Sequence, residues 1–112
     1  MAQVEAKDYC VAMTTVRTAD EGLRLANTLV GLGLATCVNV LPGAKSVYRW
    51  QGAVEEASEA VVLIKTSRAL TSEVHAALRQ MHSYELPEFV VLPIVDGCAK
   101  YLAWLGEGLG AK

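Results

Sequence analysis

The sequence predicts an α+β fold, in which two helices lie on one face of an antiparallel sheet. Two stretches of helical periodicity are separated by β-rich runs, two of these runs meet at a tight corner, and prolines bound a last short apolar run. Strands and helices that alternate in this way pack as one sheet and one helix layer. At 112 residues the chain has room for one domain, which we expect to span residues 1–112.

The first strand and the first helix are expected in the N-terminal third. Tyr9 to Val16 (YCVAMTTV) is rich in β-formers and alternates in character. Thr18 follows as a helix N-cap, and Glu21 stands three residues later, as in a capping box. Apolar residues then recur at helical spacing until Gly31 and Gly33, which end the helix.

A long hairpin is expected between residues 37 and 66, with its corner at Trp50-Gln51-Gly52-Ala53. Pro42 and Gly43 interrupt the outgoing strand and predict a bend in it. The return run from Ala60 to Thr66 is almost continuously apolar, which predicts a strand buried on both faces. An arm of roughly 14 residues spans on the order of 45 Å, so its outer half needs a partner, and a second copy of the chain is the simplest one.

The second half of the chain completes the pattern. A helix is expected from Thr71 to His82, and a short strand from Glu88 to Leu92, confined to an edge by Pro87 and Pro93. The resulting order β-α-β-β-α-β is the ferredoxin-like pattern. Residues 97–105 predict an extra C-terminal helix, which we expect to cover an edge of the sheet or a neighbouring subunit.

The composition indicates a cytoplasmic oligomer. The hydrophobic fraction of 53% and the mean hydropathy of +0.30 are high for a soluble chain. A net charge of −2 without runs of like charge argues against nucleic-acid binding. The N-terminal MAQVEAKDYC resembles neither a signal peptide nor a transit peptide, and no stretch is long enough for a membrane span. Cys10, Cys37 and Cys98 lack CxxC spacing and are expected to be small buried side chains.

The best candidate for a site is the connection 81–88, which reads MHSYELPE. It brings a thioether, an imidazole, a phenol and carboxylates together on a loop, a mixed set that suits a first-row metal. The alternative is that His82 only complements the dipole at the end of the second helix. His75, among polar neighbours, is expected on the surface.

Aromatic and charged residues add further candidates. Tyr48, Trp50, Tyr84 and Trp104 lie near predicted strand ends or in the last helix, where they would line a cleft or pack at an interface. Lys65, at the end of the return strand, would pair with a carboxylate or hold an anionic ligand.

Arg17 and Asn39 raise an enzymatic alternative. Acylphosphatases of the same fold bind phosphate with a loop arginine and place a water molecule with a strand asparagine. The glycine-rich loop whose N–H groups would cradle the phosphate is missing from this sequence. No catalytic triad, cysteine–histidine pair or P-loop is recognisable from the spacing either, so an enzyme is not expected.

Several separated motifs together resemble the CutA family of divalent-cation tolerance proteins. They read ATCVNVLPG at 35–43, SVYRWQG at 46–52, IKT at 64–66, HSYE at 82–85 and YLAW at 101–104. The resemblance implies a ferredoxin-like subunit of a stable homotrimer, similar in architecture to the PII signalling proteins, in which the long hairpins join neighbouring subunits. It also implies a role in copper and divalent-cation tolerance, a cytoplasmic location and no established catalytic activity.

The resemblance further implies metal ligands at the histidine of an HPYE-type motif, which is His82 here. Ser83 stands where proline is usual, and Met81 stands where some members have a second histidine. A thioether at that position favours Cu(I) over divalent ions. The first strand ends in Thr14-Thr15-Val16, without the cysteine to which a ligand role is attributed in some members.

These observations lead to three hypotheses. The first is a trimer that binds copper or a small ligand in a cleft between subunits, and the others are an acylphosphatase-like phosphoryl hydrolase and an inert trimeric scaffold. In the first hypothesis His82 and Met81 are metal ligands, and the cleft is lined by Tyr48, Trp50, Lys65, Tyr84 and Glu88.

Overall fold

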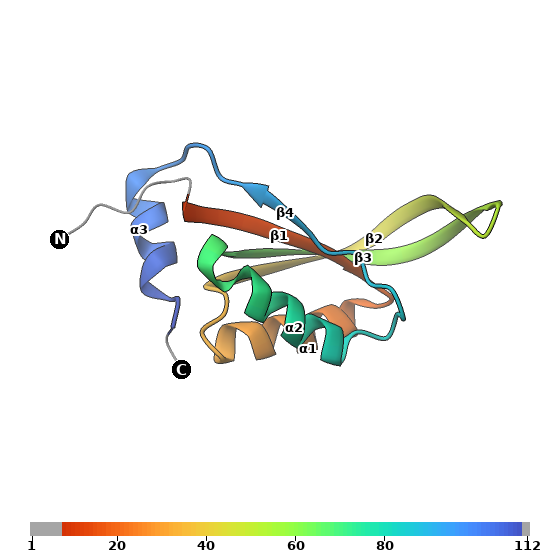
Figure 1. Ribbon diagram of the computed structural model, residues 1–112, viewed down its shortest axis with the longest axis horizontal. Coiled ribbons are helices and arrows are strands. Elements are labelled where there is room, and N and C mark those ends of the chain that lie inside the picture. The colour runs from red at the N-terminus through yellow and green to blue at the C-terminus, as the bar shows by residue number, and fades with distance from the viewer. Residues whose placement is uncertain (1–7, 111–112) are drawn as a thin grey trace.

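The computed structural model describes residues 8–110, which form a four-stranded antiparallel sheet with α1 and α2 packed on one face (Figure 1). The elements are β1 (Tyr9–Val16), α1 (Ala19–Gly31), β2 (Cys37–Trp50), β3 (Ala53–Ser67), the 3-10 helix η2 (Arg68–Leu70), α2 (Thr71–Met81), β4 (Val90–Pro93) and α3 (Ala99–Glu107). The strand order is β2-β3-β1-β4, which confirms the predicted ferredoxin-like fold and the extra C-terminal helix. Most of the N-terminal segment that was compared with leader peptides lies outside the described residues. No helix within residues 8–110 is long and apolar enough to cross a membrane.

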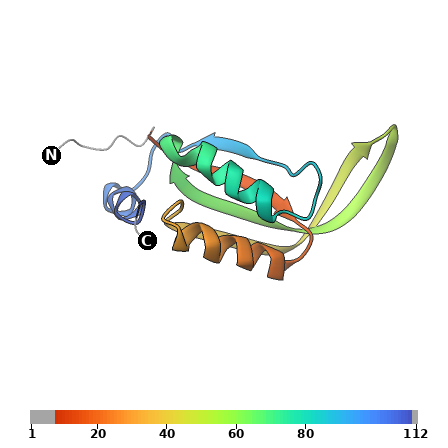
Figure 2. The ribbon, with the colours of Figure 1, turned by 60° about the horizontal axis from the view of Figure 1, so that its bottom comes forward.

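The core lies between the sheet and the two helices α1 and α2. Alternate residues of β1 and β3 point into it, and Val62 and Ile64 are fully buried against Leu29 and Leu78 of the helices. The residues between them, such as Leu63, face the other side of the sheet and are only half-buried. The prediction that β3 is buried on both faces is therefore wrong for the single chain, because the helices cover one face only (Figure 2).

The outer halves of β2 and β3 project from the body as an arm, which we define as residues 44–59 (Figures 1 and 2). The predicted bend in β2 is confirmed, since the pairing register shifts between Leu41 and Ala44 and Gly43 has a φ of +82°. The arm turns at Gln51 and Gly52, whose φ values are both positive, as a type I′ hairpin turn requires. β3 starts at Ala53, at the predicted corner, and includes residues 53–59 before the apolar run from Ala60, and the molecule extends to 53 Å.

Within residues 8–110, β4 is an edge strand that pairs only with β1. It starts later than predicted, because Phe89 leaves the sheet and stacks on His75 of α2, with ring centroids 4.4 Å apart. His75, which was expected on the surface, is half-buried under this contact. The prediction for Cys98 is also wrong: it is exposed just before α3, whereas Cys10 is buried and Cys37 half-buried.

Helix α3 closes the end of the sheet opposite the arm (Figure 1). Leu102 and Leu105 pack on Tyr9 of β1, and the hydroxyl of Thr36 donates a hydrogen bond to the carbonyl of Leu105. The helix approaches so closely that a Cβ atom at Gly106 would lie 2.2 Å from the Tyr9 hydroxyl. The helix thus covers the end of the sheet in its own chain.

Replacing Gly106 by alanine is expected to lower the free energy of unfolding by about 1–3 kcal/mol, because the added methyl group has no room beside the buried Tyr9. Gly31→Ala is the matched control, since a Cβ there meets nothing within 4 Å. It is expected to leave stability unchanged or raise it by up to about 1 kcal/mol, because alanine favours a helix. Urea denaturation of both variants measures the difference, and equal stabilities would contradict the close packing of α3.

Candidate functional site

A groove of about 870 Å³ lies at the base of the arm. The end of β1, one face of the arm and the connection after α2 line it together. The strand register explains the arm's contribution, because Tyr48 lies opposite Glu55 and both side chains therefore lie on the same face of the hairpin. The groove thus joins three segments that are far apart in the sequence.

The structure brings four of the five predicted cleft residues into this groove. Tyr48, Trp50, Tyr84 and Glu88 line it. Lys65 does not, because its ammonium group donates a hydrogen bond to the side-chain carbonyl of Asn39 in the neighbouring strand.

Trp104 does not join the other aromatic residues either. It lies on α3 at the far end of the sheet, where its ring packs against Tyr101 with the centroids 5.5 Å apart. The aromatic set expected from the sequence is therefore divided between the two ends of the molecule.

The groove is rich in carboxylates, with Arg17 as the basic residue that lines it. The acidic lining residues are Glu55, Glu59, Glu85 and Glu88. Tyr84 donates a hydrogen bond of 2.7 Å to the Glu59 carboxylate, and the Arg17 guanidinium lies 5.6 Å from the centre of the Tyr84 ring. Burial, together with the hydrogen bond and the charge of Glu59, raises the pKa of Tyr84 to about 12. Tyr84 is therefore a neutral hydrogen-bond donor that links the connection to the arm.

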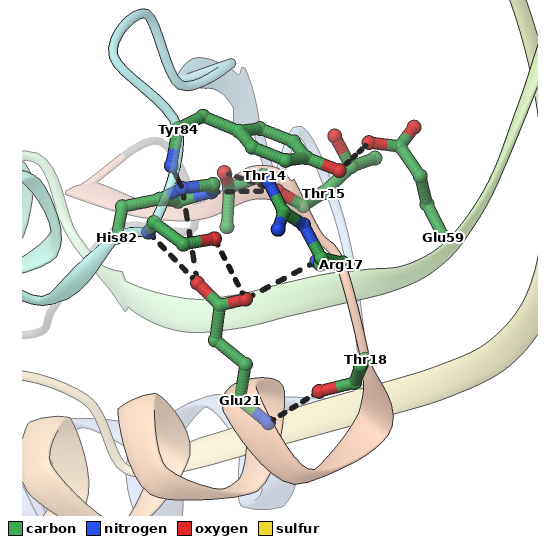
Figure 3. A network of polar contacts seen from close by, with 9 residues as sticks. Thr14, Thr15, Arg17, Thr18, Glu21, Glu59, His82 and Tyr84 are labelled. Atoms are coloured by element: carbon green, nitrogen blue, oxygen red, sulfur yellow. Dashed lines mark hydrogen bonds and ion pairs between the residues drawn. The ribbon is translucent and has the colours of Figure 1, made fainter.

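His82 lies directly behind Tyr84, and its side chain is fully buried (Figure 3). Its Nε2 atom is 2.7 Å from the carbonyl oxygen of Thr15 in β1. Its Nδ1 atom accepts a hydrogen bond of 3.0 Å from the backbone N–H of Tyr84. Both ring nitrogens are thus bonded to the backbone of their own chain.

Glu21 is the buried acid of this network, with its residue only 9% exposed. Its carboxylate accepts hydrogen bonds of 3.0 Å from the N–H and from the hydroxyl of Ser83, and one of 3.3 Å from the N–H of Arg17. Burial alone would raise the pKa of Glu21, but these hydrogen bonds from Ser83 and Arg17 hold it below its ordinary value. The ionised carboxylate therefore joins α1 to the connection that lines the groove.

The predicted capping box at the start of α1 is only half present. The hydroxyl of Thr18 accepts a hydrogen bond of 3.1 Å from the N–H of Glu21, which confirms Thr18 as the N-cap. The Glu21 carboxylate does not return to the N-cap, because it is bonded to Ser83 instead. Sequence reasoning missed this role of Glu21, since Ser83 lies 62 residues further along the chain.

The side chains of one chain do not fit a copper ion at the predicted position. Neither ring nitrogen of His82 is free, and Met81 lines a different hollow, between Arg24 and Thr28 on the surface of α1. Within residues 8–110, no three His, Cys, Asp or Glu side chains lie together as a group that could hold a metal ion. A metal at His82 would have to displace the Thr15 carbonyl or the Tyr84 amide.

Arg17 and Asn39 do not form one site. Arg17 lines the groove beside Tyr84, whereas Asn39 pairs with Leu63 inside the sheet and accepts its hydrogen bond from Lys65. An acylphosphatase-like reaction needs both side chains at the same phosphate group. The geometry therefore does not favour the phosphoryl hydrolase.

Comparisons with known proteins match residues 10–108 to the family described as CutA1 divalent ion tolerance protein. The divalent-cation tolerance protein CutA of Thermus thermophilus is 40% identical over 100 residues, which cover 89% of this chain and 97% of that one. The chloroplastic CutA of Arabidopsis thaliana is 42% identical over 85% of this chain, which spans only about half, 52%, of that relative. A solved CutA1 structure from Thermus thermophilus superposes with a TM-score of 0.88 at 39% identity, covering 91% of this chain and 99% of the other. The family match, over residues 10–108, includes the arm and the connection that line the groove.

Proposed function

Since the chain belongs to the CutA1 divalent ion tolerance family, we propose that it is a homotrimeric binding protein of divalent-cation tolerance and not an enzyme. In this proposal each subunit is a single domain, 1–112, and a small ligand binds in the groove at the base of the arm. We place the protein in the cytoplasm, although relatives are described as chloroplastic in Arabidopsis thaliana and periplasmic in Archaeoglobus fulgidus.

The observation that carries the proposal is the arm, whose apolar side chains are left open to solvent by the described part of their own chain. Val47 and Val54 are 66% and 65% exposed. The sheet face away from the helices is open as well, and Leu92 of the edge strand is 49% exposed. A protruding hairpin and an uncovered apolar sheet face together favour contact with further copies. Three copies close a ring when each packs its arm on the next one.

A trimer of this kind turns the groove into a cleft between subunits. One chain supplies Tyr48, Trp50, Tyr84 and Glu88. Lys65 belongs to the cleft only if it comes from a neighbouring copy, since in its own chain it lies on the sheet and is bonded to Asn39. Aromatic rings beside carboxylates offer apolar area and a few fixed polar groups, which is typical of small-molecule sites.

Copper binding at His82 and Met81 is less well supported than the binding of a small ligand in the groove. The donors of one chain do not fit it, because the nitrogens of His82 are both engaged and Met81 lies elsewhere. The proposal is therefore that the protein takes part in divalent-cation tolerance without holding copper at His82, and copper salt is used only to measure tolerance.

Replacing Trp50 by alanine is expected to abolish tolerance while the trimer stays intact. Trp50 lines the groove with a half-exposed ring, so its loss removes contact area for a ligand. The measurement is growth in copper salt of a host strain that lacks its own copy of this protein, supplied with either the parent chain or the variant. Sedimentation of the purified variant is measured alongside.

Trp104→Ala is the matched control, because this tryptophan is also 47% exposed but lies on α3. It is expected to keep both tolerance and trimer. An inert scaffold predicts the opposite for Trp50→Ala, since tolerance would then fail only when the trimer dissociates. Full tolerance with an intact trimer in Trp50→Ala would reject the groove as the ligand site.

A further inference from the structure

We propose that His82 is a positioning residue, which fixes Tyr84 in the groove, and that it does not bind a metal. The inference rests on the proposed function only in taking the groove as the place where Tyr84 acts. The protonation state of His82 and its test do not depend on that function.

The backbone partners of His82 determine where its proton lies. The Thr15 carbonyl can only accept a hydrogen bond, so the Nε2 atom at 2.7 Å must carry the hydrogen. The Tyr84 N–H can only donate, so the Nδ1 atom at 3.0 Å must present its lone pair. The ring is therefore neutral and held as a single tautomer, and the one lone pair that a metal could use is already bonded to Tyr84.

The bonds between Ser83 and Glu21 disfavour the other tautomer of His82, in which Nδ1 carries the proton. The Glu21 carboxylate lies 3.9 Å from Nδ1 and would attract a proton onto that nitrogen if it had no other donors. Ser83 satisfies it with two hydrogen bonds of 3.0 Å, one from its N–H and one from its hydroxyl. A proline at this position would have neither group. Nδ1 of His82 therefore keeps its lone pair for the N–H of Tyr84.

The position of Tyr84 follows from these contacts. Its backbone N–H donates to Nδ1 of the imidazole, and the centroids of the two rings are 4.8 Å apart. Its phenol hydroxyl donates to the carboxylate of Glu59 on the arm. A continuous set of contacts thus runs from Thr15 through His82 and Tyr84 to the arm (Figure 3). Copper at Nδ1 would break this set, so metal binding and the positioning of Tyr84 exclude each other.

Two variants of His82, each of which keeps one of its two hydrogen bonds, separate the bond to Tyr84 from the bond to Thr15. The side-chain oxygen of asparagine lies where Nδ1 lies and still accepts from Tyr84, whereas the amide nitrogen of glutamine lies where Nε2 lies and still donates to Thr15. Hydrogen exchange of the Tyr84 amide is measured in the parent chain, in His82→Asn and in His82→Gln. Exchange is expected to be at least about tenfold faster in His82→Gln and within about threefold of the parent in His82→Asn, because only the latter keeps the acceptor.

NMR of the folded parent chain supports or overturns the inference even if neither variant folds. The chain has two histidines, so nitrogen-15 spectra distinguish His82 from His75. We expect a protonated Nε2 and an unprotonated Nδ1 in His82, both unchanged when Cu(I) is added under reducing conditions. The opposite tautomer, a Cu(I)-dependent change confined to His82, or equally fast exchange of the Tyr84 amide in both variants would overturn the inference. If Trp50→Ala keeps full tolerance, the proposed function fails, but this result stands.

Discussion

Replacing Val54 by aspartate is expected to reduce the mass in solution from three times the 12.0 kDa chain mass to that of one chain. Val54 is 65% exposed on the arm but does not line the groove, and it lies diagonally across the hairpin from Val47. A carboxylate at this point would be buried without a partner when a neighbouring copy covers the arm, and Glu55 and Glu56 beside it would repel it. Sedimentation equilibrium at several protein concentrations measures the change.

Val95→Asp is the control for this experiment. Val95 is 84% exposed and lies in the loop between β4 and α3, away from the arm. The same change of side chain there is expected to leave the mass unchanged. A parent chain that sediments as a monomer, or a Val54→Asp variant with the mass of the parent, would contradict an assembly built on the arm.

Replacing Glu21 by alanine is expected to lower the free energy of unfolding by about 2–4 kcal/mol, because three partly buried hydrogen bonds lose their acceptor. The affected donors are the N–H and hydroxyl of Ser83 and the N–H of Arg17. The connection that lines the groove also loses its link to α1, so Tyr84 is expected to become more mobile. Urea denaturation at a fixed protein concentration measures the loss.

Asp20→Ala is the matched control for Glu21→Ala. Asp20 lies in the same first turn of α1, has the same charge and is exposed. It contributes only through the helix dipole, so its replacement is expected to cost less than about 1 kcal/mol. Equal losses in the two variants would show that the hydrogen bonds of Glu21 add no stability.

The pKa of Glu21 also predicts a dependence on pH. Since folding lowers this pKa from 4.5, the folded chain binds fewer protons there than the unfolded chain, and the contribution to stability is complete above pH 4.5. It is expected to decrease as the pH falls through the folded-state pKa. The parent chain should therefore lose more stability than Glu21→Gln between neutral pH and acid.

The elements that the sequence predicted well are those with a local pattern. Positive φ angles form the turn at Gln51 and Gly52 and the bend at Gly43. The glycines mark both positions in the sequence, because glycine adopts such angles readily. Residues 53–59 of β3 have no strand pattern of their own, because Glu55, Glu56 and Glu59 are poor strand formers, and their pairing with β2 makes them part of the sheet. The burial of β3 was misjudged because an apolar run does not show which of its faces the helices cover.

The groove was partly predictable and the network behind it was not. Tyr48 and Trp50 on one strand and Tyr84 on the connection are prominent aromatic residues, and the structure brings them to one place. The bonds between Glu21 and Ser83 leave no local trace, since a glutamate in the first turn of a helix is ordinary. Nor does a histidine at a helix end show whether its nitrogens are free, which depends on the distant Thr15 carbonyl.

The central place of β1 in the sheet determines when folding can finish during synthesis. In the part of the chain that the structure describes, β4 pairs only with β1, with Cys10 opposite Pro93 and Met13 opposite Val90. The edge of β1 that pairs with β4 therefore stays unpaired until residue 93 has left the ribosome. The hairpin of β2 and β3 needs only a short turn and is complete as soon as residue 67 emerges. A nascent chain of this protein therefore carries one unpaired strand edge through most of its translation.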